Sequence, residues 1–492
     1  MLASVTLVFL VILLLFLCHT PRPKNFPPGP RPIPIFGSFV RLNLERPIED
    51  LERLAKQYGN IFSMYIGSRP GVVLNGTKVI KEALITKAAD CSDRTLDLLY
   101  KQILQVKPHA SAVLQSDFNS SWKEQRRFGL MVLRNLGLGK QAMEQRILRE
   151  TSLIIKELEK SIGKATYHSK VFHNAACSIM SQVLFGIQHS HDDPFAKHYI
   201  ELFAQLSKII NGPWGMIYDS VPWVRHLPLP FQRAFKSIRE SHKMYEKLIA
   251  ESEKTRVHGK PRHFIDCYLD ELDKRGNDGS SFSKDQLCAM LMDLHFAGTD
   301  TTSNTLLFAL LYLMNHPEIQ ERCQQEIDMV LEGRDQVTYE DRHKMPYTQA
   351  VIHEVQRIAN IAPLSVVRRI RNDMELMGYS IPKGTLIIVN LSSVLFEEGQ
   401  WKSTHEFNPE NFLNEKGEFF KPEAFMPFSI GPRICMGEPM ARLEMFLILV
   451  TVLRKFQFIW PEDAGQPNYI PTFGTIQAPK PFSMVVQLRN KS

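Results

Sequence analysis

One cysteine near the C-terminus stands in a stretch whose residue types suit a metal ligand. The stretch runs Phe428-Ser-Ile-Gly431-Pro-Arg433-Ile-Cys435-Met-Gly437 and leads into an apolar helical pattern. A cysteine just before a helix N-terminus has its thiolate stabilised by free N–H groups and the helix dipole, and a thiolate is a good soft ligand. The two glycines let backbone approach a flat or bulky group, and Arg433 can pair with a carboxylate. The alternative is a buried free thiol in a tight turn.

A second group of reactive side chains interrupts a long apolar helix predicted over residues 285–314. Gly298, Asp300, Thr301 and Thr302 lie near its middle. Thr and Asp side chains compete for backbone carbonyls and suit a buried helix poorly, so the exception indicates function. An acid beside a hydroxyl can relay protons. The alternative is that the threonines only bond the carbonyls four residues before them.

Two further pairs lie on predicted helices. Glu354 and Arg357 are three residues apart and share one helix face, and apolar neighbours indicate that this face is buried. Trp122 and Arg126 are four residues apart, point the same way and can both bind a carboxylate. The alternative for the second pair is an exposed basic helix.

These four motifs resemble those of the cytochrome P-450 superfamily, in order and separation, over nearly the whole chain. The run from Met345 to Arg357 is similar to animal microsomal family 2, and most similar to its J-type subfamily. The resemblance implies a mainly α fold with small β-sheets and haem b (Fe-protoporphyrin IX) as the cofactor. Cys435 would then be the iron ligand and Phe428 would cover its sulfur. The residues expected to hold the rest of the haem are Trp122, Arg126, Arg368, Arg433 and Gly437.

The same resemblance gives roles to the interrupted helix and to the buried pair. Gly298 would leave room for dioxygen, Thr301 would hydrogen-bond the bound oxygen, and Asp300 would feed protons towards it. Glu354 and Arg357 would lock the core beneath the haem loop. Asn411 stands where the family has a third, arginine partner of that pair, so this member of the network is left open.

Substrate contacts are expected, by family analogy, in six mostly apolar segments: 98–118, 200–210, 235–245, 290–301, 361–367 and 473–478. The pocket candidates within them are Val113, His295, Phe296, Ala297, Ile361, Val366 and Ile476. An apolar-flanked histidine is more often a core residue, so His295 is only a candidate. No cationic residue obviously anchors a fatty-acid carboxylate.

The elements around these motifs are mostly helical. Helical periodicity dominates residues 80–345, while 61–66, 71–75, 377–390 and 471–488 have strand character. The chain of 492 residues has no Gly/Ser-rich linker, so we predict one large haem domain over 33–492. Its formal charge of +7 is spread out, which does not indicate nucleic-acid binding. Seven cysteines without a CxxC pattern suit free thiols in a reducing compartment.

The N-terminus predicts a membrane anchor. Residues 2–18 are apolar except for Ser4 and Thr6 and carry no charge, over a helical length of about 25 Å. We predict the anchor over 1–20, followed by a proline-rich hinge at 21–32. A signal peptide is the alternative, but the basic start and the cleavage site that it needs are missing. Arg22, Lys24 and Arg31 after the run place the body of the protein in the cytosol. We therefore expect the endoplasmic reticulum membrane, with the catalytic domain on the cytosolic face.

The function implied by the resemblance is a monooxygenase that hydroxylates or epoxidises lipophilic substrates such as arachidonic acid, steroids and xenobiotics. Because no Gly-rich dinucleotide loop follows a strand, electrons would come through NADPH–cytochrome P-450 reductase, with cytochrome b5 as a candidate second donor. Arg127, Arg134 and Lys140 are candidates for the reductase docking face. The alternatives are a haem-thiolate isomerase or dehydratase of hydroperoxides, a non-catalytic haem-binding protein, and a membrane-tethered scaffold.

Overall fold

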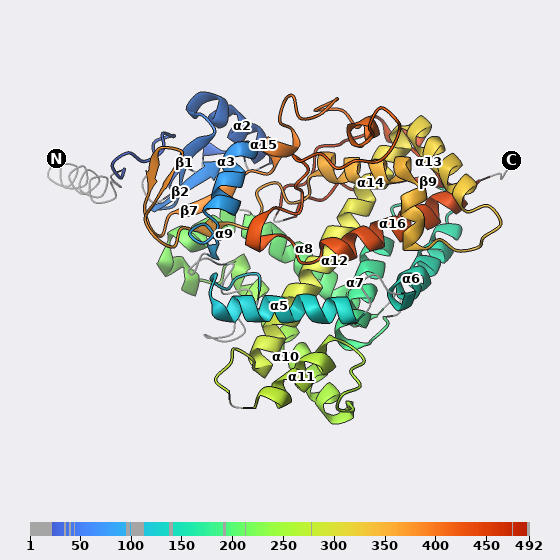
Figure 1. The fold of residues 1–492 in the computed structure, drawn as a ribbon, viewed down its shortest axis with the longest axis horizontal. Helices are drawn as coiled ribbons and strands as arrows, with labels where there is room; N and C mark the ends of the chain where they lie inside the picture. Colours follow the sequence, from blue (N-terminus) through green and yellow to red (C-terminus); the bar gives the residue numbers. More distant parts are fainter. Residues whose placement is uncertain are drawn as a thin grey trace.

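The computed structural model describes residues 22–33, 36–38, 41–43, 45–94, 99, 113–136, 141–189, 193–211, 213–276, 278–474 and 476–489. A large helical part carries a smaller β-region at one side, where β1, β2 and β7 lie beside α2 and α3 (Figure 1). The predicted mainly α class with small sheets is therefore confirmed. The predicted anchor at 1–20 lies outside the described residues.

The helices and strands are these. The helices are α2 Pro47–Tyr58, α3 Thr77–Lys81, α5 Ser120–Asn135, α6 Gln141–Glu159, α7 Ser169–Phe185, α8 Pro194–Asn211, α9 Pro213–Ser220, α10 Pro230–Thr255, α11 Phe264–Arg275, α12 Lys284–Asn315, α13 Pro317–Val330, α14 Pro346–Ala359, α15 Ser392–Leu395 and α16 Glu438–Lys455. The strands are β1 Ile61–Ile66, β2 Arg69–Leu74, β3 Asp93–Arg94, β4 Arg368–Arg369, β5 Met374–Leu376, β6 Tyr379–Ile381, β7 Leu386–Val389, β8 Phe456–Ile459 and β9 Val485–Leu488.

The largest sheet joins distant parts of the chain in the order β1-β2-β7-β4-β3. Its centre is the parallel pair β2 and β7, with Val72 opposite Ile387, and the other pairs are antiparallel. The sheet carries Arg368 on β4, which lies between β7 and β3. The proline-rich segment is fixed to the same sheet, because the N–H of Ser63 on β1 donates to the Pro28 carbonyl at 2.7 Å.

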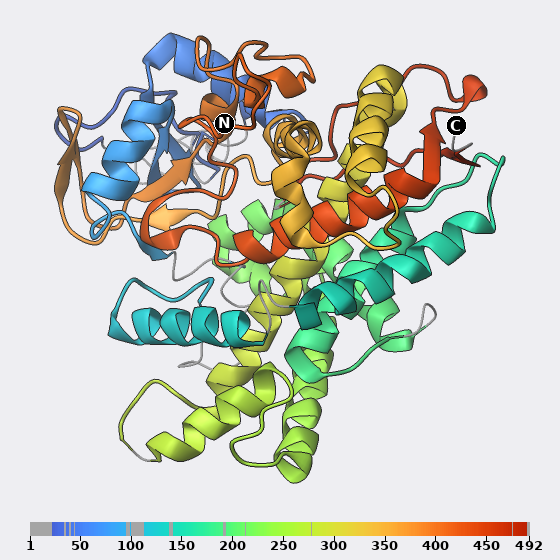
Figure 2. The same ribbon diagram turned by 45° about the vertical axis from the view of Figure 1, so that its right-hand side comes forward.

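Helix α12 is the long helix predicted from the sequence, and it passes through the middle of the helical part in both views (Figure 1, Figure 2). The Ser283 side chain caps its first turn by accepting the Gln286 N–H. Most of its residues are buried on every side, which explains why its apolar pattern has no single face. Helix α16 begins just after the cysteine loop and packs across α12 (Figure 2).

Within the described part of the chain, no helix combines the length and the apolar character that crossing a membrane requires. The six cysteines described there are free thiols, as expected.

Candidate active site

The Cys435 loop has the geometry that the sequence predicts. A short 3-10 helix, Gly431–Arg433, precedes the cysteine, and α16 begins three residues after it. The Cys435 N–H donates to the Phe428 carbonyl at 3.0 Å, which closes the loop. The N–H groups of Gly437 and Glu438 point at the sulfur and favour the thiolate.

The Cys435 side chain is accessible although protein surrounds it. Burial raises the pKa of its thiol, and the N–H groups of Gly437 and Glu438 only partly offset this effect. A metal ion reverses the balance, because a coordinating thiol is deprotonated outright. The sulfur is therefore open to a ligand and supported by N–H donors.

The two glycines of the loop do different work, which corrects the sequence expectation for one of them. Gly431 has φ +75°, and a Cβ there would lie 2.0 Å from the Leu84 carbonyl oxygen. It is needed for packing against protein backbone rather than against a cofactor. Gly437 has ordinary backbone angles and its Cβ would meet only the Cys435 sulfur, at 3.7 Å. It stays a candidate for close cofactor approach.

One stretch of α12 opens onto accessible space. Ala297 is exposed and Thr301 is half-buried, while most of the helix is buried. The Thr301 hydroxyl donates to the Ala297 carbonyl at 2.7 Å, as the alternative interpretation expects. This bond uses only the donor, so the oxygen can still accept a hydrogen bond from a partner in the accessible space.

Gly298 lies on another side of α12. A Cβ there would lie 2.5 Å from the Met180 sulfur on α7. The glycine therefore permits close packing of α12 on α7, and its predicted role in leaving room for dioxygen stays a prediction. On the accessible face of α12, the residue with a small side chain is Ala297.

His295 is a core residue, which corrects its place among the pocket candidates. It is 0% exposed, its ring stacks on Tyr199 with centroids 3.8 Å apart, and Tyr245 lies at hydrogen-bond distance, 3.0 Å, from Nδ1. Burial lowers the pKa of His295 to about 3. Its other nitrogen faces Ser181 and Cys177 of α7. Because an α-helix has 3.6 residues per turn, His295 lies on the side of α12 away from Ala297.

Asp300 has a partner that no sequence motif predicts. Its Oδ1 lies 3.4 Å from Nε2 of His173 on α7 and accepts a hydrogen bond from Asn304 at 3.0 Å. His173 is 127 positions away in the chain, and only the packing of α7 on α12 brings the two together.

Arginines gather beside the cysteine loop around Trp122. Arg433 lies over the indole at 4.2 Å and Arg126 at 5.4 Å. Arg126 donates to the Ile434 carbonyl within the loop. The indole N–H of Trp122 donates to the Val113 carbonyl at 2.9 Å. Because that N–H is its only donor, Trp122 supports the arginines here rather than presenting a free donor of its own.

Arg368 and Arg433 are buried, and within the described part of the chain no salt bridge joins either of them to a carboxylate. Burial and the neighbouring arginines lower the pKa of Arg368 to about 9 and that of Arg433 to about 8. Arg368 is 1% exposed, and its Nε and Nη1 have no hydrogen-bond partner among the described residues. Arg369 differs, because Asp117 and Asp93 neutralise it. Buried cations need a partner, and the two propionates of haem would supply the missing negative charge, so the residues present fit that cofactor.

The Glu354–Arg357 pair is wholly buried, and the structure identifies its third partner. Two bonds of 2.7 Å join the guanidinium to the carboxylate. The Asn411 side-chain amide donates to both Glu354 oxygens at 3.2 Å, and to the Ser403 carbonyl. Arg357 also binds carbonyls of the 403–406 segment. An amide thus takes the place where the family has an arginine.

The remaining pocket candidates stay predictions. The Gln477 N–H donates to the Ile361 carbonyl at 2.7 Å, so two of the six predicted segments do meet. The Val366 carbonyl accepts from Arg94 at 2.7 Å. Val113 and Phe296 are buried, and Ile476 is half-buried. Most of segment 98–118 lies outside the described residues.

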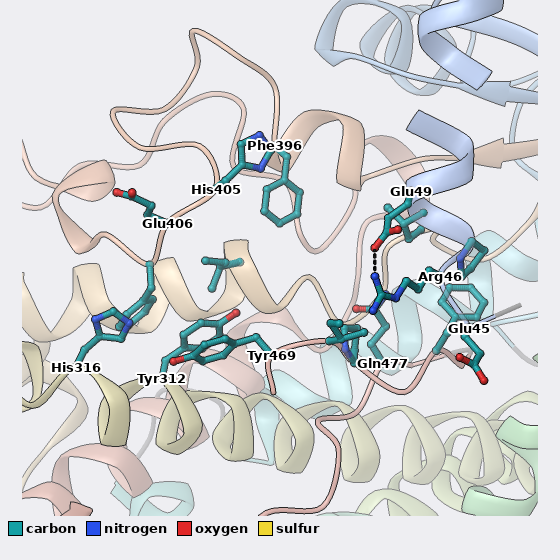
Figure 3. Close-up of a pocket in the computed structure, with 17 residues that line it drawn as sticks. Glu45, Arg46, Glu49, Tyr312, His316, Phe396, His405, Glu406, Tyr469 and Gln477 are labelled. Atoms are coloured by element: carbon teal, nitrogen blue, oxygen red, sulfur yellow. Dashed lines mark hydrogen bonds and ion pairs between the residues drawn. The ribbon is translucent and has the colours of Figure 1, made fainter. Parts of the chain in front are cut away.

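A separate cavity of about 780 Å³ lies further along α12. Tyr312 on its wall stacks on Phe407 and Tyr469, each with centroids 4.9 Å apart. An Arg46–Glu49 ion pair stands at its other end (Figure 3). None of the cysteine-loop, Thr301 or arginine side chains described above lines this cavity, so it is not the candidate active site.

The chain is similar to known proteins over nearly its whole length. The family described as Cytochrome P450 matches residues 27–486. This chain belongs to the cytochrome P450 family. Cytochrome P450 2D15 of Canis lupus familiaris is 38% identical over 487 residues, which cover 98% of this chain and 97% of that one.

Relatives of other subfamilies are about equally similar to this P450. Cytochrome P450 2F2 of Mus musculus is 36% identical over 470 residues (94% of each chain), and cytochrome P450 2J2 of Homo sapiens is 38% identical over 444 residues (90% of this chain, 87% of that one). The comparisons confirm family 2 without favouring its J-type subfamily. Proteins of this family are oxidoreductases, haem-thiolate monooxygenases that carry haem b.

Proposed function

We propose that this P450 inserts one oxygen atom of O2 into a lipophilic substrate, with electrons from NADPH delivered by a separate reductase. The balanced reaction is RH + O2 + NADPH + H⁺ → ROH + H2O + NADP⁺, and for an alkene the product is the epoxide. The observation that carries the proposal is the Asp300–Thr301 pair at the accessible stretch of α12. Splitting O2 with loss of water consumes two protons, and this pair can supply them.

The chain's residues would divide the work as follows. Cys435 would bind the iron, and a thiolate-ligated haem supplies the electron density that favours O–O cleavage. Arg368, Arg433 and Arg126 would neutralise the propionates. Thr301 would hold a proton at Oγ1 beside the reacting oxygen.

The substrate is proposed to be lipophilic, in the class of polyunsaturated fatty acids, steroids or xenobiotics. The pocket candidates Ala297, Ile361, Val366 and Ile476 are apolar. With residues 1–20 as an anchor, the protein would sit at the endoplasmic reticulum membrane with its catalytic domain in the cytosol. Substrates dissolved in the bilayer would then lie close to the catalytic domain.

The reductase is proposed to dock on the exposed face of α5. Arg127 and Arg134 are exposed there, and Lys140 lies outside the described residues. The same helix carries Arg126, which reaches the cysteine loop. Electrons arriving at this face would enter close to Cys435. Cytochrome b5 would compete for the same positive surface.

The first experiment is the difference spectrum of the reduced protein with carbon monoxide. A strongly red-shifted Soret band supports thiolate ligation, and an unshifted band would overturn it. The second compares Thr301→Ala with the wild type, using arachidonic acid, reductase and NADPH. We expect the variant to keep haem but to consume NADPH with little product. Unchanged coupling of NADPH to product would remove Thr301 from the relay. A wild type that forms no product with reductase and NADPH, but rearranges a hydroperoxide without them, would favour the hydroperoxide isomerase.

A further inference from the structure

The contact between α7 and α12 holds a histidine against the acid of the proposed relay. His173 Nδ1 lies 2.9 Å from the Ser169 carbonyl oxygen, which can only accept a hydrogen bond. Nδ1 therefore carries a proton. Nε2 faces Asp300 Oδ1 at 3.4 Å. Two lone pairs would repel at this contact, so one further proton belongs between the histidine and the carboxyl.

We propose that His173 is a positioning residue that holds the Asp300 carboxyl and reloads it with protons. The inference rests on the monooxygenase function proposed above. In each transfer a proton leaves Nε2 of His173 for Oδ1 of Asp300 and then passes to Oγ1 of Thr301, which gives up its own hydroxyl proton to the reacting oxygen. His173 regains its proton from solvent. The two protons and the two electrons from NADPH together reduce the second oxygen atom to water.

The position of the pair suits this role. The His173 side chain is 14% exposed and that of Asp300 is 25% exposed, so both reach water without being free in it. Asn304 fixes the same Oδ1 atom from the next turn of α12 and carries no charge. Among the described residues, no hydrogen bond joins Asp300 to Thr301. The carboxyl must therefore rotate between His173 and Thr301, or a water molecule must bridge the gap.

Other titratable groups face α7 at different heights. Glu150 of α6 bonds Gln182, and His295 of α12 lies at Cys177. His263, at the start of α11, packs on Gly186. Lys170 precedes His173 by three residues on the same helix and is exposed. Within the described residues, His173 is the group at ion-pair distance from Asp300.

The decisive variant is His173→Gln. A glutamine amide can still donate to Asp300, so the carboxyl stays held, but it cannot pass on a proton. We expect product per NADPH to fall about tenfold, with hydrogen peroxide as the balance, and the pH profile of coupling to differ from that of the wild type. His343→Gln is the matched control, because His343 also faces a carboxylate, Glu340 at 3.7 Å, but on the surface.

A bypass reaction separates the proton role from a structural one. Cumene hydroperoxide delivers its oxygen already reduced, so turnover driven by it needs neither reductase nor relay protons. We expect His173→Gln to equal the wild type in that reaction. An equal loss in both reactions would make His173 merely structural, and coupling with the wild-type pH profile would overturn the proposal. A wild type without a red-shifted carbon monoxide band or peroxide-driven turnover would instead defeat the monooxygenase function itself.

A measurement without turnover completes the test. In protein labelled with ¹³C at its histidines and held as the reduced carbon monoxide complex, the signal lost in His173→Gln belongs to His173. We expect the pH dependence of this signal to change in Asp300→Asn and to stay unchanged in Glu340→Gln. The same pH dependence in the wild type and Asp300→Asn would show that the two groups share no proton.

Discussion

Asn411→Asp tests the buried network beneath the haem loop with a change of almost no volume. The substitution replaces a donor amide by an acceptor oxygen at a residue that is 2% exposed. The amide now donates to both oxygens of Glu354 at 3.2 Å. The introduced carboxyl would face that carboxylate across the same distance. We expect a large loss of stability that depends on pH.

The magnitude follows from the contacts. Losing a donor to a charged acceptor costs about 1.5–3 kcal/mol, and two charges about 4 Å apart repel by about 4 kcal/mol at an effective dielectric constant of about 20. The chain can avoid the repulsion by protonating the introduced carboxyl, at about 1.4 kcal/mol for each pH unit above about 3.9. That is about 5 kcal/mol at pH 7.5. The protonated carboxyl keeps a donor towards Glu354, so it costs less than the ionised state, in which repulsion and the lost donor add to about 6 kcal/mol. The expected loss at pH 7.5 is therefore about 5 kcal/mol.

The sign of the pH effect follows from the same step. The native state raises the pKa of the introduced carboxyl above its unfolded value, so the destabilisation is full above the native pKa and fades as pH falls towards about 3.9. At pH 5.5 protonation costs only about 2 kcal/mol, and the protonated group can donate to Glu354 again. Because folded proteins are stable by only about 5–15 kcal/mol, the variant should be strongly weakened at pH 7.5 and partly rescued at pH 5.5.

The assay is the urea concentration that halves the carbon monoxide difference band, measured at both pH values. Asn414→Asp is the matched control, since the Asn414 amide also donates to a glutamate, Glu418 at 2.9 Å, but in an exposed turn. We expect the control to change stability by less than about 1 kcal/mol. Equal midpoints for the two variants, or a loss for Asn411→Asp that grows as pH falls, would refute the reasoning.

Three further changes test other parts of the site. Gly431→Ala should abolish haem incorporation, because its Cβ would lie 2.0 Å from the Leu84 carbonyl oxygen. The control is Gly417→Ala, also at φ +75° but with open space around it, which should load haem normally. The measurement is the haem-to-protein ratio after purification. Arg368→Met should speed haem loss to apomyoglobin about 10- to 100-fold, since a buried charge-assisted bond is worth about 1.5–3 kcal/mol, and an unchanged rate would remove the residue from the site. Arg134→Glu should raise the reductase concentration needed for half-maximal turnover at low salt and have little effect at high salt; salt-independent coupling in the wild type would argue against electrostatic docking.

The sequence predicts local structure well wherever a pattern has a local cause. The predicted long helix over 285–314 and the structure's α12 agree almost to the residue, because an apolar run between a Ser cap and a polar end leaves little choice. The Cys435 loop and the start of α16 follow from glycine and proline in the same way. The strands at 61–66 and 71–75 are also confirmed, with β2 beginning two residues earlier, at Arg69.

The sequence does not predict those contacts that depend on tertiary packing. His295 lies only two residues from Ala297, yet it faces α7, α8 and α10 rather than accessible space. At Gly298 the space for a Cβ is occupied by Met180 of α7, a contact that the helix pattern does not predict. His173 was missed because nothing near it in the chain marks it. A periodic pattern determines the directions of side chains around one helix, but not which neighbouring element each side chain contacts.

The arginine cluster shows why the cofactor and the fold belong together. Arg368 and Arg433 are buried near Arg94 and Arg126, and the lowered pKa values record their mutual repulsion and lost hydration. In a chain without haem these charges oppose folding. Two haem propionates would remove the opposition, and part of the free energy of haem binding would then stabilise the surrounding segments. Haem affinity and resistance to unfolding should therefore rise and fall together in variants of these arginines, while variants of Asn411 should lower stability at unchanged intrinsic haem affinity.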